Sequence, residues 1–129
     1  VNVVALGRCT AKGLLKQIRH EGHWRQNSFV LSQCKFVLAF EHAVLKNYVT
    51  EKAYVAASAG AIPVYIGDNE TLCSVMNCKR VLLWSSDTTE KIKKMLANQT
   101  LYEQIQNRQI ILSHALTIAD PPTANDLDP

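Results

Sequence analysis

Residues 40–52, FEHAVLKNYVTEK, gather charged and aromatic side chains directly after a run of apolar residues. Thr50 is a good N-cap, so a helix is expected to begin after it, with Glu51 and Lys52 as its first two residues. A cation in the first helical turn is unfavourable by about 0.3 to 1 kcal/mol, because the N-terminus of a helix carries a partial positive charge. A phosphate or pyrophosphate bound at that end would reverse the sign of the effect for Lys52.

Two neighbouring side chains extend this chemistry. Glu51 can accept hydrogen bonds from sugar hydroxyls, and Tyr48 offers a flat aromatic face and a hydroxyl. Together with Lys52 they predict a site for a nucleotide-sugar. A purely structural interpretation stays open from spacing alone: Glu51 complements the helix dipole, Lys52 points into water and Tyr48 fills the loop.

The surrounding elements must place this loop at the edge of a sheet. Residues 34–40, CKFVLAF, are apolar on both alternating faces, which is typical of a strand buried between two helical layers. Further strands are expected at 62–67 and 81–84, and helices at 51–59, 87–96 and 101–115. This order predicts an α/β domain with a mainly parallel sheet, and such sheets bind ligands at the carboxyl ends of their strands.

Local signals mark the ends of these elements. Gly60 stands where the residue after a helix C-cap belongs, and Asp87 and Glu90 have the spacing of a capping box. Trp84 closes an apolar run and is expected to be a packing residue. The chain therefore divides into a domain at 1–117 and an extended or mobile tail at 118–129, which is rich in proline and aspartate.

Length and composition bound the function. A chain of 129 residues, 47% hydrophobic and 19% charged, fits one soluble globular domain or one half of a two-lobed protein. No apolar run is long enough to span a membrane, and no targeting signal is recognised within these residues. A net charge of +3 with scattered basic residues does not indicate nucleic-acid binding.

The cysteines and the glycosylation sequons bear on the compartment. Four cysteines lack the Cys-x-x-Cys pairs of a zinc site, so disulfides stay open without an assigned pairing. The two sequons, Asn69-Glu70-Thr71 and Asn98-Gln99-Thr100, favour a secretory compartment slightly.

Residues 34–68 resemble the signature of the α1,3/α1,4-fucosyltransferases. In that family a strand ending in Phe-Glu-Asn leads through a short loop to Tyr-(Ile/Val)-Thr-Glu-Lys, a helix, and Gly-x-(Ile/Val)-Pro-(Ile/Val). The corresponding segments here are Phe-Glu-His at 40–42, Tyr-Val-Thr-Glu-Lys at 48–52 and Gly-Ala-Ile-Pro-Val at 60–64, in the same order and without a gap. Gly-Arg-Cys at 7–9 resembles a further element of the eukaryotic members.

The resemblance implies a Rossmann-like lobe with helices on both faces, the C-terminal donor-binding lobe of a GT-B glycosyltransferase. It implies that the chain holds GDP-fucose, with Tyr48 and Glu51 on the nucleotide and its sugars and Lys52 on the leaving pyrophosphate. Glu41 is expected near the fucose or orienting the loop. His42 replaces the family's asparagine, so its contact with the donor has a different geometry. The implied reaction transfers fucose, with inversion, to a hydroxyl of an acceptor glycan, and no metal cofactor is required.

The same resemblance places the rest of the enzyme elsewhere. The chain is too short to include the N-terminal lobe, which in this family binds the acceptor and carries the carboxylate that acts as general base. No catalytic residue is therefore assigned, and the isolated chain is expected to be inactive. In a eukaryote the expected compartment is the Golgi lumen. No metal ligand is assigned, because Asp126-Leu127-Asp128 lies in the tail and Gly22 interrupts any helix that would pair His20 with His23.

Two alternatives stay open. The first alternative to the fucosyltransferase is a GT-B lobe for another nucleotide-sugar, because a helix followed by Ala-Gly-Ala-Ile-Pro-Val occurs in several such families. The second is a noncatalytic module that binds a glycan or a protein. Comparing GDP with UDP distinguishes the first alternative from the fucosyltransferase, and binding of neither nucleotide favours the second.

Overall fold

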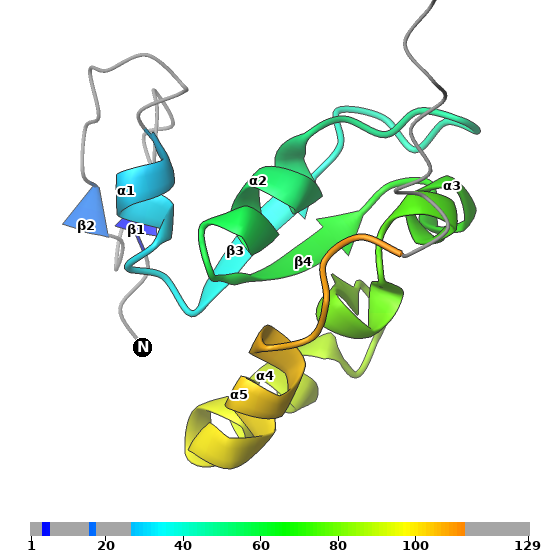
Figure 1. Cartoon of the computed structure of the whole chain (residues 1–129). Coiled ribbons are helices and arrows are strands. Elements are labelled where there is room, and N and C mark those ends of the chain that lie inside the picture. The colour runs from blue at the N-terminus through cyan, green and yellow to red at the C-terminus, as the bar shows by residue number, and fades with distance from the viewer. Residues whose placement is uncertain (1–3, 6–15, 18–26, 113–129) are drawn as a thin grey trace, which may run out of the picture.

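The computed structural model describes residues 4–5, 16–17 and 27–112 (Figure 1). Outside these residues lie the expected domain end at 117, the tail, His20 and His23, and the Gly-Arg-Cys element. Two short strands, β1 (Val4–Ala5) and β2 (Lys16–Gln17), pair in parallel as a separate sheet. A one-turn helix, α1 (Asn27–Leu31), then precedes the main sheet.

The main sheet has three parallel strands in the order β3–β4–β5. These are β3 (Phe36–Phe40), β4 (Ile62–Ile66) and β5 (Leu82–Leu83). The central strand β4 is the most deeply buried, with Ile62, Val64 and Tyr65 fully covered. A strand covered on both faces reads as a continuous apolar run, which is why IPVYI is predictable as a strand despite its proline.

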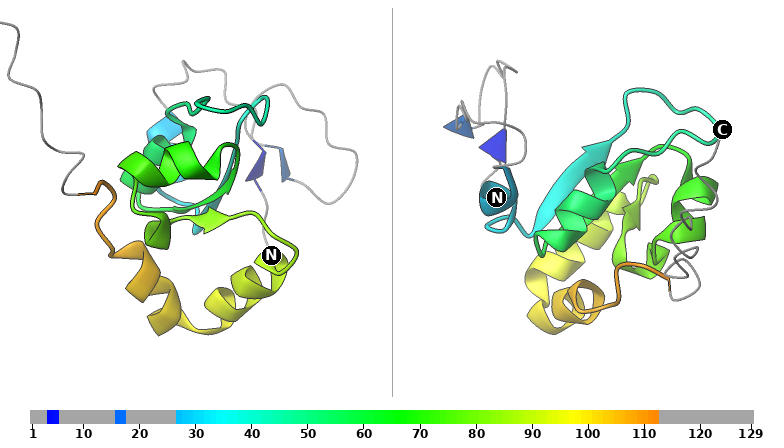
Figure 2. Two further views of the ribbon diagram at one scale, coloured as in Figure 1. Left: turned by 90° about the vertical axis from the view of Figure 1, so that its right-hand side faces the viewer. Right: turned by 45° about the horizontal axis from the view of Figure 1, so that its top comes forward.

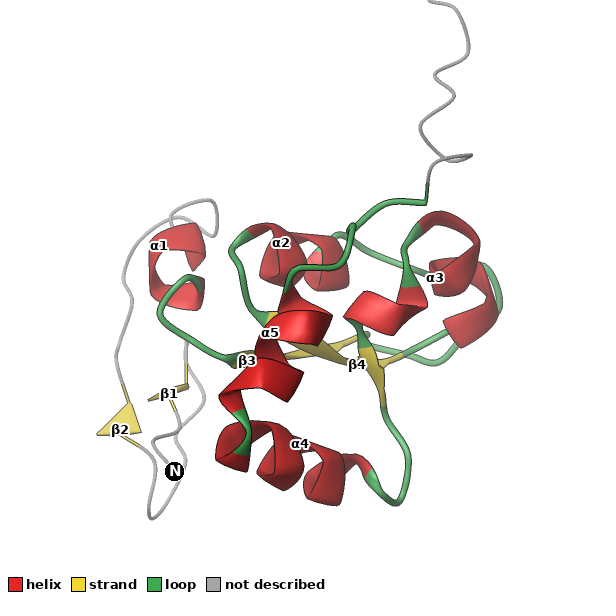
Figure 3. Ribbon diagram, turned by 60° about the horizontal axis from the view of Figure 1, so that its bottom comes forward, coloured by secondary structure: helices red, strands yellow, loops and turns green. Residues whose placement is uncertain are grey.

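Helices cover both faces of this sheet (Figure 3). On one face, α2 (Lys52–Ser58) and α3 (Asn69–Val75) pack their apolar residues around Tyr65 and Ala39. On the other, α4 (Thr88–Ala97) and α5 (Gln99–Gln106) place Met95 and Tyr102 against Ile62. The small residues Ala53 and Ala57 let α2 lie close to the strands. The prediction of a layered α/β domain with a parallel sheet is confirmed.

The expectation that residues 34–40 are covered on both faces is wrong for part of the strand. Within the described sheet β3 is an edge strand, and Leu38 is 65% exposed. Phe36, at the amino end of β3, packs against the cluster of Ile62, Met95 and Tyr102, and its ring meets the Tyr102 ring edge-on with the ring centroids 5.7 Å apart. Towards the carboxyl end, the rings of Phe40 and Trp84 meet edge-on with their centroids 5.8 Å apart, and Trp84 is half exposed.

The start of α2 differs from the predicted one. The helix begins at Lys52 with Glu51 as its N-cap, so Thr50 is not the cap and Lys52 is the first helical residue instead of the second. The reason is that Thr50 gives both its backbone N–H and its hydroxyl to Glu41. The predicted end is confirmed, because Gly60 follows the C-cap with a left-handed φ of 92°.

The two last helices also correct the prediction. Asp87 is the N-cap of α4, but the capping box is not formed: Asp87 accepts from Ser85 Oγ at 2.5 Å, and Glu90 pairs with Lys93 at 2.8 Å. Helix α5 ends at Gln106 rather than near 115. The following residues leave the helix because they hydrogen bond to the end of α3, where Ile111 forms an antiparallel bridge with Met76.

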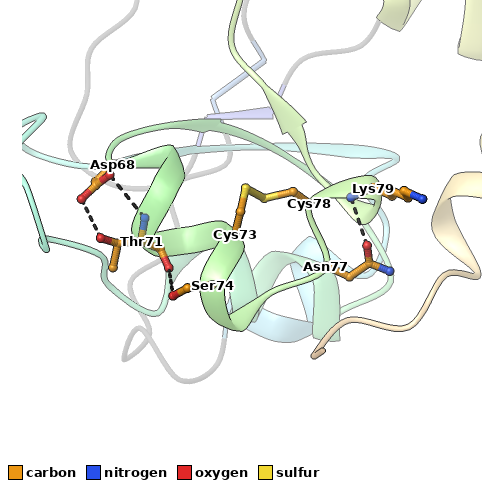
Figure 4. The surroundings of a disulfide bond; sticks show 7 residues. All are labelled: Asp68, Thr71, Cys73, Ser74, Asn77, Cys78 and Lys79. Atoms are coloured by element: carbon orange, nitrogen blue, oxygen red, sulfur yellow. Dashed lines mark hydrogen bonds between the residues drawn. A yellow bond between two sulfur atoms is a disulfide. The ribbon is translucent and has the colours of Figure 1, made fainter. Parts of the chain in front are cut away.

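A disulfide joins Cys73 in α3 to Cys78, the first residue of the short 3-10 helix η2 (Cys78–Arg80) (Figure 4). The cysteine spacing alone left this pairing open. In the described part of the chain no helix is long and apolar enough to cross a bilayer.

Candidate functional site

The loop at residues 41–51 leaves β3 at the carboxyl edge of the sheet and returns into α2 (Figures 1 and 2). The backbone N–H of Glu41 donates to the carbonyl of Ile66 at 2.8 Å, which extends the ladder one residue beyond β3. The end of β4 therefore lies beside the start of this loop. Parallel sheets bind ligands at this edge, as the sequence predicted.

Glu41 is the anchor of the loop. Its side chain has no exposed surface, and it accepts hydrogen bonds from the backbone N–H of Thr50 at 2.8 Å, from Thr50 Oγ1 at 2.7 Å and from Lys52 Nζ at 3.2 Å. Burial by itself raises the pKa of this carboxyl, but the Thr50 bonds and the Lys52 cation outweigh burial and lower the pKa below its usual value. Glu41 is therefore ionised in the folded protein at neutral pH.

This contact accounts for the cation at the start of α2. The Lys52 ammonium pairs with Glu41, so an anion within the chain offsets the unfavourable end of the helix. The Lys52 side chain is still 29% exposed. Of its three ammonium protons, one is used on Glu41 in the described structure, and the others are free to meet a further acceptor.

A second polar cluster fastens the tip of the loop to α3. Asp68, the N-cap of α3, accepts from the backbone N–H of Asn47 at 2.7 Å and from Thr71 Oγ1 at 2.6 Å. Asn47 has a left-handed φ of 62°, which asparagine tolerates better than most residues. The Thr71 and Asn47 bonds lower the pKa of Asp68. Sequence reasoning missed this cluster, although an aspartate directly after a predicted strand is a recognisable N-cap signal.

Tyr65 and Gly67 pack beneath Glu41. The Tyr65 hydroxyl is buried without a hydrogen-bond partner in the described structure. Burial, together with the negative charges of Glu41 and Asp68, raises the pKa of Tyr65 to about 12. A Cβ atom at position 67 would collide with the Tyr65 hydroxyl and lie 2.8 Å from Cγ of Glu41. Gly67 is therefore required for close packing as well as for ending the strand.

The other predicted site residues lie on the same loop with freer side chains. His42 and Glu51 are exposed, and Tyr48 is half-buried. None of the three side chains makes a hydrogen bond or an ion pair to another described residue. The structure thus brings Glu41 and Lys52 into contact and leaves the other three without a polar side-chain partner among the described residues. In the described ranges, no group of three His, Cys, Asp or Glu side chains is arranged to hold a metal ion.

Acid should weaken the fold in part through Glu41. Its pKa is lowered from an ordinary value of 4.5, so the unfolded chain binds the proton more readily, and the stability that Glu41 contributes is lost as the pH falls below 4.5. Urea unfolding from neutral pH down through this range measures the loss. Because Glu41→Gln removes this titration, the gap in unfolding free energy between wild type and variant should shrink on acidification. A gap that is constant with pH would contradict the assignment.

A parallel three-stranded sheet with helices on both faces, and polar side chains gathered at the carboxyl edge, defines a Rossmann-like ligand-binding lobe. The family model "Glycosyltransferase family 10 (fucosyltransferase) C-term" matches residues 1–105. The chain belongs to this family, and the fold is that of one lobe of a GT-B glycosyltransferase.

Individual relatives agree with the family match. GDP-fucose protein O-fucosyltransferase 3 of Xenopus laevis is 34% identical over 112 residues, which are 81% of this chain and 24% of the relative. A putative fucosyltransferase of Acanthamoeba polyphaga mimivirus is 32% identical over 123 residues, 86% of this chain and 20% of the relative. The chain thus spans about a quarter or less of the length of these relatives.

Two solved structures share the fold. A crystal structure of an α1,3-fucosyltransferase with GDP-fucose has a TM-score of 0.57 and 26% identity, covering 64% of this chain and 25% of that one. A crystal structure of an α1,3-fucosyltransferase with GDP has a TM-score of 0.60 and 24% identity, covering 75% and 28%. The second likeness supports the fold alone.

Proposed function

We propose that this chain is the donor-binding part of a fucosyltransferase and that it holds GDP-fucose at the loop formed by residues 41–52. The family match, the GDP-fucose named with the relatives and the GDP-fucose in the similar structure support this donor. The observation that carries the placement is Lys52: a partly exposed ammonium, held by a buried carboxylate at the carboxyl edge of a parallel sheet. The negative charge of a nucleoside diphosphate is balanced by such a cation, and the carboxyl edge is where parallel sheets bind ligands.

Each loop residue has a distinct role in this proposal. Lys52 neutralises the pyrophosphate as GDP leaves, which lowers the energy of a transition state in which that charge grows. Because α2 has only seven residues, we assign the attraction mainly to the ammonium and not to the helix dipole. Glu51 and Tyr48 contact the nucleotide and its sugars, and His42 lies beside them.

Glu41 acts as a positioning residue. Its carboxylate has no exposed surface, so the role of orienting the loop is favoured over contact with the fucose. It holds Lys52 and Thr50 in place before the donor arrives, which reduces the ordering cost of binding.

The remainder of the reaction is assigned outside this chain. An acceptor hydroxyl attacks the anomeric carbon with inversion and must lose its proton to a base, which we place in a further lobe. The acceptor is a glycan or, as the names of several relatives suggest, a protein hydroxyl. We propose that transfer needs no metal cofactor, and unchanged GDP affinity with and without a chelator tests the donor-binding part of this statement.

We further propose that the protein works in the lumen of the secretory pathway, in the Golgi of a eukaryotic cell. The Cys73–Cys78 disulfide supports an oxidising compartment, since cytosolic reductants keep most such thiols reduced.

Calorimetric titration with GDP tests the donor site. We expect measurable, salt-sensitive binding by the wild type and weaker binding of UDP. Lys52→Ala should bind GDP at least severalfold more weakly, on the order of 1 kcal/mol or more for a charge-assisted contact.

Lys46→Ala is the matched control, because Lys46 is an exposed lysine of the same loop without a described ion pair. It removes the same charge from the loop and should leave the affinity nearly unchanged. Equal GDP affinity for wild type and folded Lys52→Ala would remove Lys52 from the site. Failure of the folded wild type to bind either nucleotide would favour a noncatalytic module.

A further inference from the structure

The turn between α4 and α5 carries a sequon that the donor site does not use. Asn98 ends α4 and caps α5, and its Oδ1 accepts from the backbone N–H of Leu101 at 3.1 Å. The residue is exposed, and its Nδ2 has no hydrogen-bond partner in the described structure. An N-linked glycan is bonded to Nδ2, so glycosylation would leave the hydrogen bond from Leu101 N–H to Oδ1 intact.

This turn lies at the opposite edge of the sheet from the candidate site. Gln99 accepts a hydrogen bond from Lys35 Nζ at 2.8 Å, and Lys35 directly precedes the amino end of β3. The loop at residues 41–51 leaves the other end of the same strand. Figures 1 and 3 show the α4–α5 junction well away from α3, which lies beside that loop. A large group on Asn98 would therefore stay clear of the donor.

A separate observation concerns the compartment. The Cys73–Cys78 disulfide indicates that the chain folds under oxidising conditions, and the secretory compartment that provides them also performs N-linked glycosylation. The sequon Asn98-Gln99-Thr100 has the required hydroxyl residue at its third position. The exposed amide, its location and the disulfide thus point to the same modification.

We propose that Asn98 carries an N-linked glycan when the protein passes through the secretory pathway of a eukaryotic cell. The co-reactant is a lipid-linked oligosaccharide pyrophosphate, used by the transferase of the host cell. The bond between its anomeric carbon and the pyrophosphate oxygen breaks, a bond from that carbon to Nδ2 of Asn98 forms, one amide proton is lost and the lipid pyrophosphate departs. The proposal rests on the lumenal location given above.

The other sequon occupies a different setting. Asn69 begins α3 beside Asp68, and the Thr71 hydroxyl of its sequon donates to that aspartate at 2.6 Å (Figure 4). A glycan on Asn69 would lie at the carboxyl edge, next to the loop that we assign to the donor. Asn69 therefore serves as the comparison site in the experiment.

The experiment is secretion of the full chain from a eukaryotic host, followed by mass spectrometry with and without peptide N-glycanase. Thr100→Ala destroys the sequon and Asn98→Asp removes the amide nitrogen, while both leave the Oδ1 cap of α5. We expect the wild type, Thr100→Ser and Asn69→Gln to carry a glycan on Asn98, and Thr100→Ala and Asn98→Asp to lack it. A second glycan on Asn69 of the wild type would leave the inference supported.

An unmodified Asn98 in the secreted, disulfide-bonded wild type would overturn the proposal. The mass measurement does not depend on nucleotide binding, so a failure of the glycan proposal can be distinguished from a failure of the proposed donor site. Where GDP binds, the glycosylated and enzymatically deglycosylated forms of Asn69→Gln, which can carry only the Asn98 glycan of the two, should have equal affinities within experimental error. A severalfold difference between them would contradict the placement of this glycan away from the donor.

Discussion

Replacing Glu41 by alanine is expected to lower the free energy of unfolding by about 2 to 4 kcal/mol, because a buried carboxylate with three hydrogen-bond donors is lost. The Thr50 N–H and hydroxyl would lose their acceptor, and Lys52 would stand at a helix N-terminus without its counter-charge. We place the cost below that of a fully buried pair, since Lys52 is partly exposed and water can hydrate it. Urea unfolding at neutral pH measures the change.

Two variants separate the charge of Glu41 from its position. Glu41→Gln keeps an oxygen acceptor for Thr50 but not the charge for Lys52, so its loss of stability should be smaller than that of Glu41→Ala. Glu51→Ala removes an exposed carboxylate of the same loop and should change the unfolding free energy by no more than about 0.5 kcal/mol. Equal effects for Glu41→Ala and Glu51→Ala would show that the buried contacts contribute nothing.

Replacing Gly67 by alanine should cost about 1 to 3 kcal/mol of unfolding free energy, as overpacking of a filled core does. The added methyl group would collide with the hydroxyl of Tyr65 and press against Cγ of Glu41. Neither neighbour moves easily, because the Tyr65 ring is fully buried and the Glu41 carboxylate is held by three bonds. The midpoint of urea unfolding, with its slope unchanged, reports the loss.

The collision with Tyr65 can be tested by a double-mutant cycle. Tyr65→Phe removes a buried hydroxyl that has no hydrogen-bond partner in the described structure, so alone it should be neutral or stabilising. Combined with Gly67→Ala, it should recover part of the lost stability by giving the methyl group room. Additive effects of the two substitutions would mean that the hydroxyl is not the obstacle.

Both expectations concern the scaffold that holds Lys52, and they bear on the donor site. If Glu41 positions the ammonium, folded Glu41→Gln should bind GDP more weakly than wild type while Lys52 is still present. Binding of the donor and the ion pair with Glu41 thus both depend on the orientation of the Lys52 side chain.

Residues 40–52 by themselves indicated the position of a ligand-binding site in the chain. The strand at 36–40 was predictable because its apolar residues form a nearly continuous run, and the helix after it because Thr50 and Gly60 stand as signals at its two ends. Both kinds of signal depend only on local sequence. The order of strands and helices then required this loop to lie at the carboxyl edge. The presence of Lys52 at a helix start was also a property of sequence, and it raised the question of which anion offsets it.

Only the tertiary structure decided that this anion includes Glu41, eleven residues earlier in the chain. The same holds for the Asp68 cluster, for the Cys73–Cys78 pairing and for the early end of α5, each of which depends on contacts between separate elements. Pattern rules describe one segment at a time, whereas hydrogen bonds at a sheet edge are chosen by segments that folding brings together. For that reason Thr50 bonds to Glu41 instead of capping α2, although its type and position favour a cap.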